Sequence, residues 1–403
     1  MKTIAIAGTF DSKGEEFSYV KEIIEGLGLK TFMIHTGVFE PKFTPDVSND
    51  EVVKAVGGDI KEIVAKKDRA LATDILSRGM EKLLPKLYSE GKFDGILSFG
   101  GSGGTSIVTP GMRALPIGVP KVMVSTVAAG DISMYVGTSD IVMYPSIVDV
   151  AGLNSISTKI FTNAAFAIAG MVKFESKIDL NKKPLIAATM FGVTTPCINK
   201  SREYLEKLGY EVLIFHATGT GGKAMESLIR DGYIEGVLDI TTTEWCDQLF
   251  GGNMAAGEDR LEAAVLNKIP QIVSVGALDM VNFGPISSVP SKYVGRNFYK
   301  HNPMVTLMRT TVEENRQLGL IIAEKLNMAQ IKTALLLPLK GVSLLDSEGQ
   351  QFYGVEEDAM LFKTLKENIT NPLVEIIEIN SNINDEEFSI TAAQKLVQLL
   401  NEK

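Results

Sequence analysis

Cysteine and histidine are scarce in this chain. Cys197 and Cys246 are the only cysteines among 403 residues, and only three histidines are present. Two cysteines exclude a disulfide framework, and they fit a reducing compartment best. So few cysteine and histidine side chains also exclude a zinc site with the usual ligand spacing.

The chain also lacks an excess of positive charge and any long apolar run. Its formal charge of −9 leaves no basic stripe for phosphates, which excludes nucleic acid as the main partner. The longest apolar stretch, near residues 164–172, is too short to span a bilayer. The first apolar run, residues 4–8, is stopped by Asp11 and Lys13, which indicates a β-strand rather than a signal peptide. We therefore expect a cytoplasmic protein without membrane contact.

Apolar segments and amphipathic segments alternate along the whole sequence. This order is typical of βαβ units with parallel sheets, and a length of 403 residues favours two domains. Residues 4–8 resemble residues 185–189, and each segment leads through a helix to a strand that ends in His35 or His216. We therefore predict an α/β fold of two Rossmann-like, three-layer domains related by internal duplication. Unrelated βαβ units that mimic part of the pattern are the alternative.

The polar stretch 176–183 is the expected boundary between the two halves. It predicts an N-terminal nucleotide-binding domain over residues 1–180 and a C-terminal domain over residues 181–403. Matching segments later in the two halves are less far apart than the first ones, so we expect an insertion in the first half within residues 38–75.

Residues 99–106, with the sequence FGGSGGTS, are the most informative segment. They follow an apolar run at 95–98, expected to be a buried strand, and precede residues 107–115, where we expect a helix to start. Glycine amides at a strand-to-helix turn approach an anion closely and point along the positive end of the helix dipole. The segment predicts a phosphate cradle. A tight turn that needs glycine at positive φ is the alternative interpretation.

The cradle matches neither of two common phosphate-binding motifs. The Gly-Lys-Ser/Thr of a Walker A loop is absent, and Ser106 stands where a Rossmann fingerprint has a glycine. The segment is closer to the Gly-Gly-Asp-Gly-Thr loops of phosphofructokinase-like and NAD kinase-like folds, with Ser102 in place of the aspartate. The residues expected to bind phosphate are Gly100, Gly101, Ser102, Gly103, Gly104 and Thr105.

Polar residues at other strand ends are further candidates, because ligands of open α/β sheets bind beyond the carboxyl ends of the strands. After the first strand, we expect Thr9 to donate to phosphate and Lys13 to neutralise it. Asp11, or alternatively Glu15, is expected to hold Mg²⁺ directly or through water. Helix capping by Asp11 is the alternative. Thr126 and Asp140 follow later strands and are expected to close over a nucleotide, unless they belong to ordinary loops.

The second half offers polar residues that suit a hydroxylated or anionic ligand. His216 stands beside a second glycine-rich loop, where it is placed for acid–base work. Cys246 lies near Glu244 and Asp247, which disfavour its thiolate, so we do not expect a nucleophile there. The second half also contains a run of three threonines at 241–243. The high β-propensity of threonine is the alternative explanation of this run. The predicted substrate-binding residues are Thr194, Thr195, His216, Gly221, Gly222, Thr241, Thr242, Thr243 and Glu244.

Several long segments resemble one known family. They are residues 100–106, 116–122, 189–197, 236–244, 274–285 and 307–315. These segments are similar to the uncharacterised bacterial and fungal relatives of the N-terminal inhibitory domain of the tomato mosaic virus resistance protein. The resemblance spans essentially the whole chain. It implies two Rossmann-like subdomains, ATP bound with Mg²⁺, and a homodimer.

The resemblance also assigns the nucleotide to the first half. It implies nucleotide contacts from Thr9, Asp11, Lys13, residues 100–105, Thr126 and Asp140. The antiviral role belongs to a specialised plant relative and is not implied. Many relatives carry a further barrel domain that this sequence does not include.

We therefore expect an ATP–Mg²⁺-binding protein that acts as a nucleotide-dependent enzyme on a small acid or polyol held between the two halves. Phosphoryl transfer needs mostly positioning and charge stabilisation, which glycine loops, a lysine and a metal supply. The sequence assigns no general base, so a nucleotide-dependent binding or regulatory protein without turnover is the alternative. ATP consumption in the presence of small acids separates the two.

Overall fold

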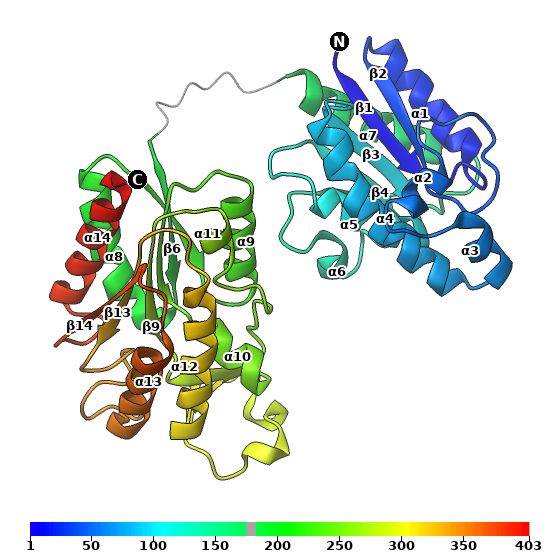
Figure 1. Ribbon diagram of the computed structural model, residues 1–403. Helices are drawn as coiled ribbons and strands as arrows, with labels where there is room; N and C mark the ends of the chain where they lie inside the picture. The colour runs from blue at the N-terminus through cyan, green and yellow to red at the C-terminus, as the bar shows by residue number, and fades with distance from the viewer. Residues whose placement is uncertain (175–182, 403) are drawn as a thin grey trace. The chain divides into compact units, whose positions relative to one another are not determined.

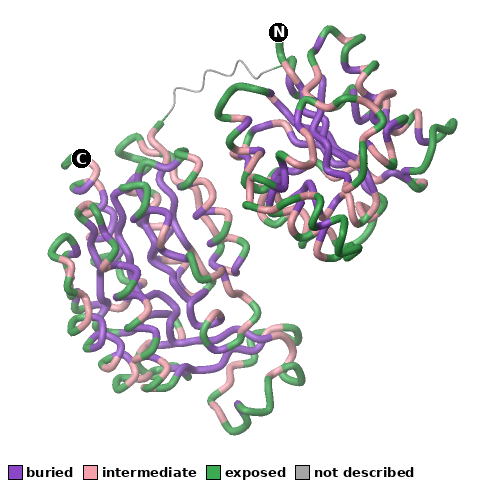
Figure 2. The backbone as a smooth tube through the Cα atoms, turned by 45° about the vertical axis from the view of Figure 1, so that its right-hand side comes forward, coloured by how far each residue is buried: buried purple, intermediate pink, exposed green. Residues whose placement is uncertain are grey.

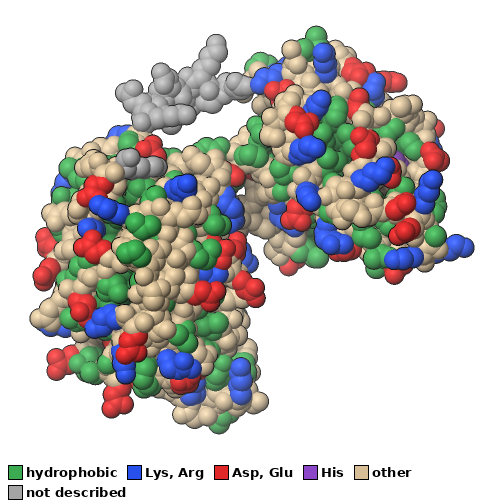
Figure 3. Space-filling view, in the orientation of Figure 1, with side chains coloured by type: hydrophobic (Ala, Val, Ile, Leu, Met, Phe, Trp, Pro, Cys, Tyr) green, Lys and Arg blue, Asp and Glu red, His purple; other side chains and the backbone are tan. Residues whose placement is uncertain are grey.

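The computed structural model describes residues 1–174 and 183–402, which belong to two compact units, Met1–Ile178 and Asp179–Lys403. The predicted boundary at residue 180 lies outside the described residues. Figure 1 shows helices on both faces of a central sheet in each unit, and Figure 2 shows that the strands carry most of the buried backbone. Acidic and basic side chains are mixed over the visible face of each unit (Figure 3).

The N-terminal unit is built on a five-stranded parallel sheet with the order β2-β1-β3-β4-β5. Its strands are β1 (Thr3–Gly8), β2 (Lys30–His35), β3 (Gly95–Gly100), β4 (Lys121–Ser125) and β5 (Val142–Pro145). Its helices are α1 (Gly14–Gly26), α2 (Asn49–Lys54), α3 (Ile60–Lys66), α4 (Arg69–Ser89), α5 (Ser102–Arg113), α6 (Ser133–Val136) and α7 (Ser157–Lys173).

Two apolar clusters cover the two faces of this sheet. On one face, Phe17 of α1 and Phe161 of α7 pack with strand residues such as Phe99. On the other face, Leu76 of α4 and Val108 of α5 pack against the sheet. A sheet covered on both faces needs continuous apolar strands, and every residue of β3 is buried.

The C-terminal unit repeats this strand order and extends it. Its six-stranded parallel sheet has the order β7-β6-β8-β9-β13-β14 when followed from β7. The strands are β6 (Leu185–Met190), β7 (Glu211–His216), β8 (Gly236–Thr241), β9 (Gln271–Gly276), β13 (Thr333–Pro338) and β14 (Val374–Ile379). A separate antiparallel sheet joins β10 (Met280–Phe283), β12 (Val305–Arg309) and β11 (Phe298–Asn302).

Helices again cover both faces of the larger sheet. Those on one face, α8 (Thr195–Lys207) and α14 (Glu386–Asn401), pack through Ile198 and Phe388. The helices on the other face are α9 (Thr220–Arg230), α11 (Ala263–Leu266), α12 (Val312–Asn327) and α13 (Val355–Asn368), joined by α10 (Glu244–Phe250). Short 3₁₀ turns complete the unit as η1 (Gly192–Thr194), η2 (Ile286–Ser288) and η3 (Ser291–Tyr293).

The predicted fold class of two Rossmann-like α/β domains is confirmed. The two extra helices α2 and α3 lie between β2 and β3, inside the predicted insertion at 38–75. The start of α5 was predicted wrongly: it begins at Ser102 rather than at residue 107. Glycine is a poor helix former, so its abundance at 100–104 hides the first turn of the helix in the sequence.

Two smaller features bear on earlier expectations. Within the described ranges 1–174 and 183–402, no helix is both long and apolar enough to cross a membrane. Cys197 and Cys246 are both buried and unpaired as thiols. Burial, more than the nearby carboxylate of Asp247, raises the pKa of the Cys246 thiol.

Candidate functional site

A cavity of about 800 Å³ lies at the carboxyl edge of the N-terminal sheet. Polar residues line it from the segment after β1, namely Thr9, Asp11, Ser12 and Lys13. The first turn of α5 lines it through Gly101–Gly104. The structure thus brings together seven of the eleven residues predicted for nucleotide binding: Thr9, Asp11, Lys13, Gly101, Ser102, Gly103 and Gly104.

The N-terminus of α5 presents open amides to this cavity. The first intrahelical bond runs from the Thr105 amide to the Gly101 carbonyl at 3.0 Å, which leaves the amides of residues 102–104 without helical acceptors. Gly101 occupies the N-cap position, and no side chain within the described residues caps the helix. Such an N-terminus favours an anion through both its amides and the helix dipole.

Backbone conformation does not explain the glycines of this segment. None of Gly100, Gly101, Gly103 and Gly104 has a positive φ, so the tight-turn alternative is wrong for them. Added Cβ atoms at Gly101 and Gly104 would meet their nearest atoms at 3.6 and 3.8 Å, which is ordinary contact. At Gly103, the nearest atom is Nη2 of Arg69 at 3.4 Å. Gly101, Gly103 and Gly104 therefore leave open space rather than satisfy a turn.

The segment after β1 is fixed by its own hydrogen bonds rather than by capping α1. The α1 N-cap is Lys13, and no side chain of the described residues caps this helix, so the capping alternative for Asp11 is wrong. The Asp11 carboxylate accepts from the Ser12 amide at 2.7 Å and the Phe39 amide at 3.1 Å. Lys13 donates to the Val150 carbonyl. Each carboxylate oxygen of Asp11 keeps a lone pair for a further partner.

The segment from α3 to α4 completes the cavity with cations and an apolar wall. Lys67, in a left-handed conformation with φ 50°, and Arg69, the first residue of α4, supply positive charge. The cavity is also lined by the carboxylates of Asp68 and Asp149. Its apolar lining residues are Val38, Phe39, Ile63, Val64, Ala72, Leu76 and Ile107. Sequence reasoning missed this segment, because its short helices carry no recognisable binding motif.

The remaining predicted nucleotide residues do not line the cavity. The Asp140 carboxylate accepts from Lys121 Nζ at 2.6 Å and from the Gly118 amide at 2.7 Å, so it holds the start of β4. The Thr105 hydroxyl lies 2.7 Å from that of Ser125. Thr126 is exposed, and its hydroxyl would lie 3.6 Å from a Cβ at Gly101. Gly100 belongs to β3.

In the C-terminal unit, the predicted substrate residues form a buried ionic cluster instead of a cavity lining. Glu244 Oε1 accepts from the amides of Gly219 and Gly222 at 2.7 and 3.0 Å, and its Oε2 accepts from Arg260 Nε at 2.7 Å. Arg260 is also paired with Asp239. A Cβ at Gly222 would lie 2.2 Å from Glu244 Oε2, so this glycine makes room for the carboxylate.

The threonines of this unit are likewise used internally. Thr194 and Thr241 share a hydrogen bond of 2.8 Å between their hydroxyls. Thr242 donates to the Ser274 carbonyl at 3.0 Å and Thr243 to the Met280 carbonyl at 3.4 Å. Thr195 donates to the Phe191 carbonyl at 3.1 Å. His216 is exposed at the end of β7. A Cβ added at Gly221 would lie 1.8 Å from the backbone carbonyl oxygen of His216.

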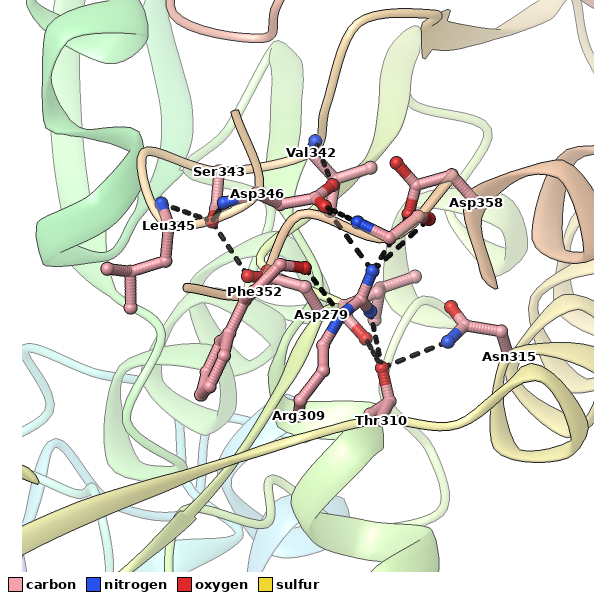
Figure 4. A network of polar contacts seen from close by, with 12 residues as sticks. Asp279, Arg309, Thr310, Asn315, Val342, Ser343, Leu345, Asp346, Phe352 and Asp358 are labelled. Carbon is pink, nitrogen blue, oxygen red and sulfur yellow. Dashed lines mark hydrogen bonds and ion pairs between the residues drawn. The ribbon is translucent and has the colours of Figure 1, made fainter. Parts of the chain in front are cut away.

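A second buried network, which the sequence did not reveal, surrounds Arg309 (Figure 4). Arg309 Nη2 lies 3.3 Å from the Oδ1 atoms of both Asp346 and Asp358. Asp279 accepts from the Ser343 hydroxyl at 2.8 Å. Burial, with a contribution from Asp346, raises the pKa of Asp279 to about 7. Burial and the neighbouring Asp358 raise the pKa of Asp346 to about 8.

Metal ligands are not gathered into a protein cage in either unit. Over residues 1–174 and 183–402, no group of three or more His, Cys, Asp or Glu side chains is arranged to hold a metal ion. Mg²⁺ commonly takes only one or two carboxylates and completes its shell with waters and substrate phosphates. Asp11 is one carboxylate that lines the cavity of the N-terminal unit.

Comparisons with solved structures give low overall similarity. UDP-GlcNAc 2-epimerase from Methanocaldococcus jannaschii, in complex with UDP-GlcNAc and UDP, is 11% identical and aligns over 100% of this chain and 94% of its own, with a TM-score of 0.21. A putative UDP-N-acetylglucosamine 2-epimerase from Listeria monocytogenes is 12% identical over 97% and 94%, with a TM-score of 0.23. At these scores the similarity carries no argument about function.

Sequence comparisons are far more specific. A UPF0261 protein of Clostridium tetani is 55% identical over 400 residues, 99% of both chains, and one of Rhizobium meliloti is 44% identical over 100% of both. The ToMV resistance protein Tm-1(GCR237) of Solanum lycopersicum is 46% identical over 82% of this chain, but over 45% of its own length. The N-terminal domain of the uncharacterised protein family UPF0261 matches residues 2–177, and its C-terminal domain matches residues 183–400. The chain therefore belongs to the UPF0261 family.

Proposed function

We propose that the N-terminal domain binds a nucleotide, ATP with Mg²⁺, in the cavity at the carboxyl edge of its sheet. The observation that carries this proposal is the opening of the uncapped N-terminus of α5 onto a cavity of about 800 Å³. That volume is within the usual range for small-molecule sites. Glycines that are not needed for backbone conformation fit the close approach of a phosphate chain.

The two sides of the cavity suit the two ends of a nucleotide. Phosphates would take hydrogen bonds from the amides of Ser102, Gly103 and Gly104, and their charge would be balanced by Arg69 and Lys13. The apolar side chains of α3, α4 and α5 would pack against the base, which is flat and largely apolar on its faces. The arrangement therefore separates an anionic end from an apolar end, as a nucleotide does.

Magnesium would be held by Asp11. Asp149 is a further aspartate of the cavity lining. When bound, Mg²⁺ would neutralise phosphate charge and fix the phosphate chain. Asp11 is suited to this role because the two amides that it accepts from orient its carboxylate without using all of its lone pairs.

Two uses of the bound nucleotide remain separate candidates. The first is a nucleotide-dependent enzyme that acts on a small acid or polyol. The second is a binding or regulatory protein without turnover. The hydrogen bonding of Thr194, Thr241 and Glu244 inside the C-terminal domain favours the second, because these groups are already satisfied. A homodimer, which the family resemblance implies, and a cytoplasmic location, which the composition predicts, complete the proposal.

Isothermal titration of the full chain with ATP tests the binding proposal. We expect saturable binding of one nucleotide per chain with Mg²⁺ present and weaker binding after chelation with EDTA. Titrations with ADP, AMP and adenosine should show progressively lower affinity as phosphates are removed. No binding of any of these ligands would overturn the proposal. Measurement of ADP release with small carboxylic acids and polyols then separates enzyme from regulator.

A further inference from the structure

The hydroxyl of Thr36 is the one polar group of the cavity lining that is both buried and unpartnered among the described residues. Thr36 follows β2 and lines the cavity, and its exposed fraction is 0%. No hydrogen-bond partner of its Oγ1 lies within the described residues. A buried hydroxyl without a partner lowers stability, so a native structure that keeps one calls for an explanation.

The other threonine hydroxyls of the lining are engaged. Thr73 Oγ1 donates to the Arg69 carbonyl at 2.8 Å. Thr9 Oγ1 lies 3.0 Å from the Ser12 hydroxyl. The contrast indicates that Thr36 is reserved for a partner that enters the cavity rather than for the protein itself.

The position of Thr36 is firmly set by the chain around it. Its amide donates to the Gly8 carbonyl at 2.8 Å, which continues the pairing of β1 with β2. The preceding His35 accepts from the Phe10 amide at 3.2 Å and lies 2.9 Å from the Phe39 carbonyl through its other ring nitrogen. The backbone is therefore fixed, while staggered rotamers about χ1 allow the hydroxyl to turn toward a ligand.

The strand order determines how far Thr36 lies from the N-terminus of α5, where the phosphates are proposed to bind. β1 lies between β2 and β3, and α5 begins just after β3. Neighbouring strands are about 4.8 Å apart, so the end of β2 lies about 10 Å from the end of β3. In a nucleotide whose phosphates lie at α5, the sugar is the part that reaches this distance before the base.

We propose that the Thr36 hydroxyl hydrogen-bonds a ribose hydroxyl of the bound nucleotide and thereby selects ribonucleotides over deoxynucleotides. A threonine hydroxyl both donates and accepts, as a sugar hydroxyl does, so the two groups satisfy each other. This inference rests on the nucleotide binding proposed above. It adds a specificity-determining residue at the sugar.

The test is a double-mutant cycle in which one group is removed from the protein and the other from the ligand. The affinities of ATP, 2′-deoxy-ATP and 3′-deoxy-ATP are measured by titration calorimetry in the presence of Mg²⁺. We expect Thr36→Val to weaken ATP binding about five- to tenfold, which is the effect of one neutral hydrogen bond. The same substitution should change by less than about twofold the affinity of the deoxy analogue that lacks the contacted hydroxyl.

Control variants separate this role from a structural one. Thr36→Ser keeps the hydroxyl and should bind ATP within about twofold of the wild type. Thr158→Val, on α7 and outside the cavity lining, should bind all three ligands like the wild type. Without ligand, Thr36→Val should resist urea at least as well as the wild type, because it removes an unsatisfied polar group.

Each other outcome overturns the inference. An equal loss for all three nucleotides, or no loss for any of them, would remove Thr36 from sugar recognition while leaving nucleotide binding intact. Failure of the wild type to bind all three would instead overturn the proposed function itself. A marked loss of stability in Thr36→Val would show that the hydroxyl serves the fold.

Discussion

The Gly222 amide donates to Oε1 of Glu244, with 3.0 Å between the two atoms. A protein carboxylate therefore fills the N-terminus of α9, which belongs to the second glycine-rich loop. In the N-terminal domain, the N-terminus of α5 has no such partner among the described residues. The protein therefore satisfies the N-terminus of α9, whereas the N-terminus of α5 is left open and adjoins a cavity of about 800 Å³.

Glu244→Gln should destabilise the C-terminal domain and spare nucleotide binding. The substitution replaces one carboxylate oxygen by an NH₂ group, which cannot accept a hydrogen bond from Arg260 or from the glycine amides. At least one buried donor therefore loses its acceptor, at a cost of about 1–3 kcal/mol. Trp245, the only tryptophan, is buried in this domain, so its fluorescence during guanidinium unfolding reports the domain directly. ATP affinity at the N-terminal cavity should stay within about twofold.

The matched control for this substitution is Glu203→Gln, which changes an exposed glutamate on α8. Its unfolding midpoint should equal that of the wild type, because isolated surface charges contribute little. A Glu244→Gln variant as stable as the wild type but unable to use ATP would restore Glu244 as a substrate-binding residue, as the sequence first predicted.

Gly103→Leu should abolish nucleotide binding without unfolding the domain. A Cβ at Gly103 meets only Arg69 Nη2, at 3.4 Å, so the fold has room for a side chain that would then fill the phosphate position. We expect ATP affinity to fall at least about tenfold, or 1.4 kcal/mol. Titration calorimetry measures the affinity, and circular dichroism checks the fold.

Gly170→Leu provides the comparison, because a Cβ at Gly170 meets no atom within 4 Å and the residue lies on α7, away from the cavity lining. It should bind ATP like the wild type. Unchanged affinity in Gly103→Leu would place the nucleotide elsewhere.

The parallel strands and the cavity end of the sheet were predictable because local patterns determine them. Apolar runs such as residues 4–8 and 95–98 mark buried parallel strands, and parallel strands bring their carboxyl ends to one edge. Thr9, Lys13 and Gly103 follow such ends and were therefore found. The start of α5 was missed, since glycine content opposes a helix that tertiary packing nevertheless stabilises.

The rest of the site depends on contacts between side chains of different elements, and these contacts cannot be predicted from the local patterns of a single sequence. Arg69 reaches the glycine segment only because α4 packs on α5. Thr36 is distinguished from the other threonines of the cavity lining only by the absence of a partner for its hydroxyl among the described residues. Glu244 and Arg260 are distant in sequence, so their pairing, which turns a predicted substrate residue into a buried contact, was invisible.

Arg69→Gln should weaken the binding of a nucleotide more strongly the more phosphate charge the nucleotide carries. The guanidinium stands beside the first turn of α5, where phosphates are proposed to bind. Loss of a charge-assisted hydrogen bond costs about 1.5–3 kcal/mol, so ATP affinity should fall about tenfold or more while adenosine affinity stays nearly constant. Arg78→Gln is the control, since Arg78 pairs with Asp74 on the exposed side of the same helix. Equal losses for ATP and adenosine would contradict a phosphate contact.

The stability of the C-terminal domain should fall as pH rises from about 4 to about 8. Burial raises the pKa of Asp279 to about 7 and, together with Asp358, the pKa of Asp346 to about 8. In the unfolded chain both carboxyls titrate near pH 3.9, so between these values the native state binds more protons. Deprotonation then favours unfolding, by roughly a few kcal/mol in total.

Asp279→Asn isolates one of these groups, because an amide stays neutral across this range. Unfolding followed by Trp245 fluorescence at several pH values between 5 and 8.5 should show a shallower fall in the variant than in the wild type. At pH 8 the variant should be at least as stable, since it avoids a buried charge whose Oδ1 has no partner among the described residues. Asp259→Asn, at an exposed ion pair with Arg230, should keep the wild-type slope. Parallel pH profiles for the wild type and Asp279→Asn would mean that Asp279 is ionised in the folded protein at neutral pH.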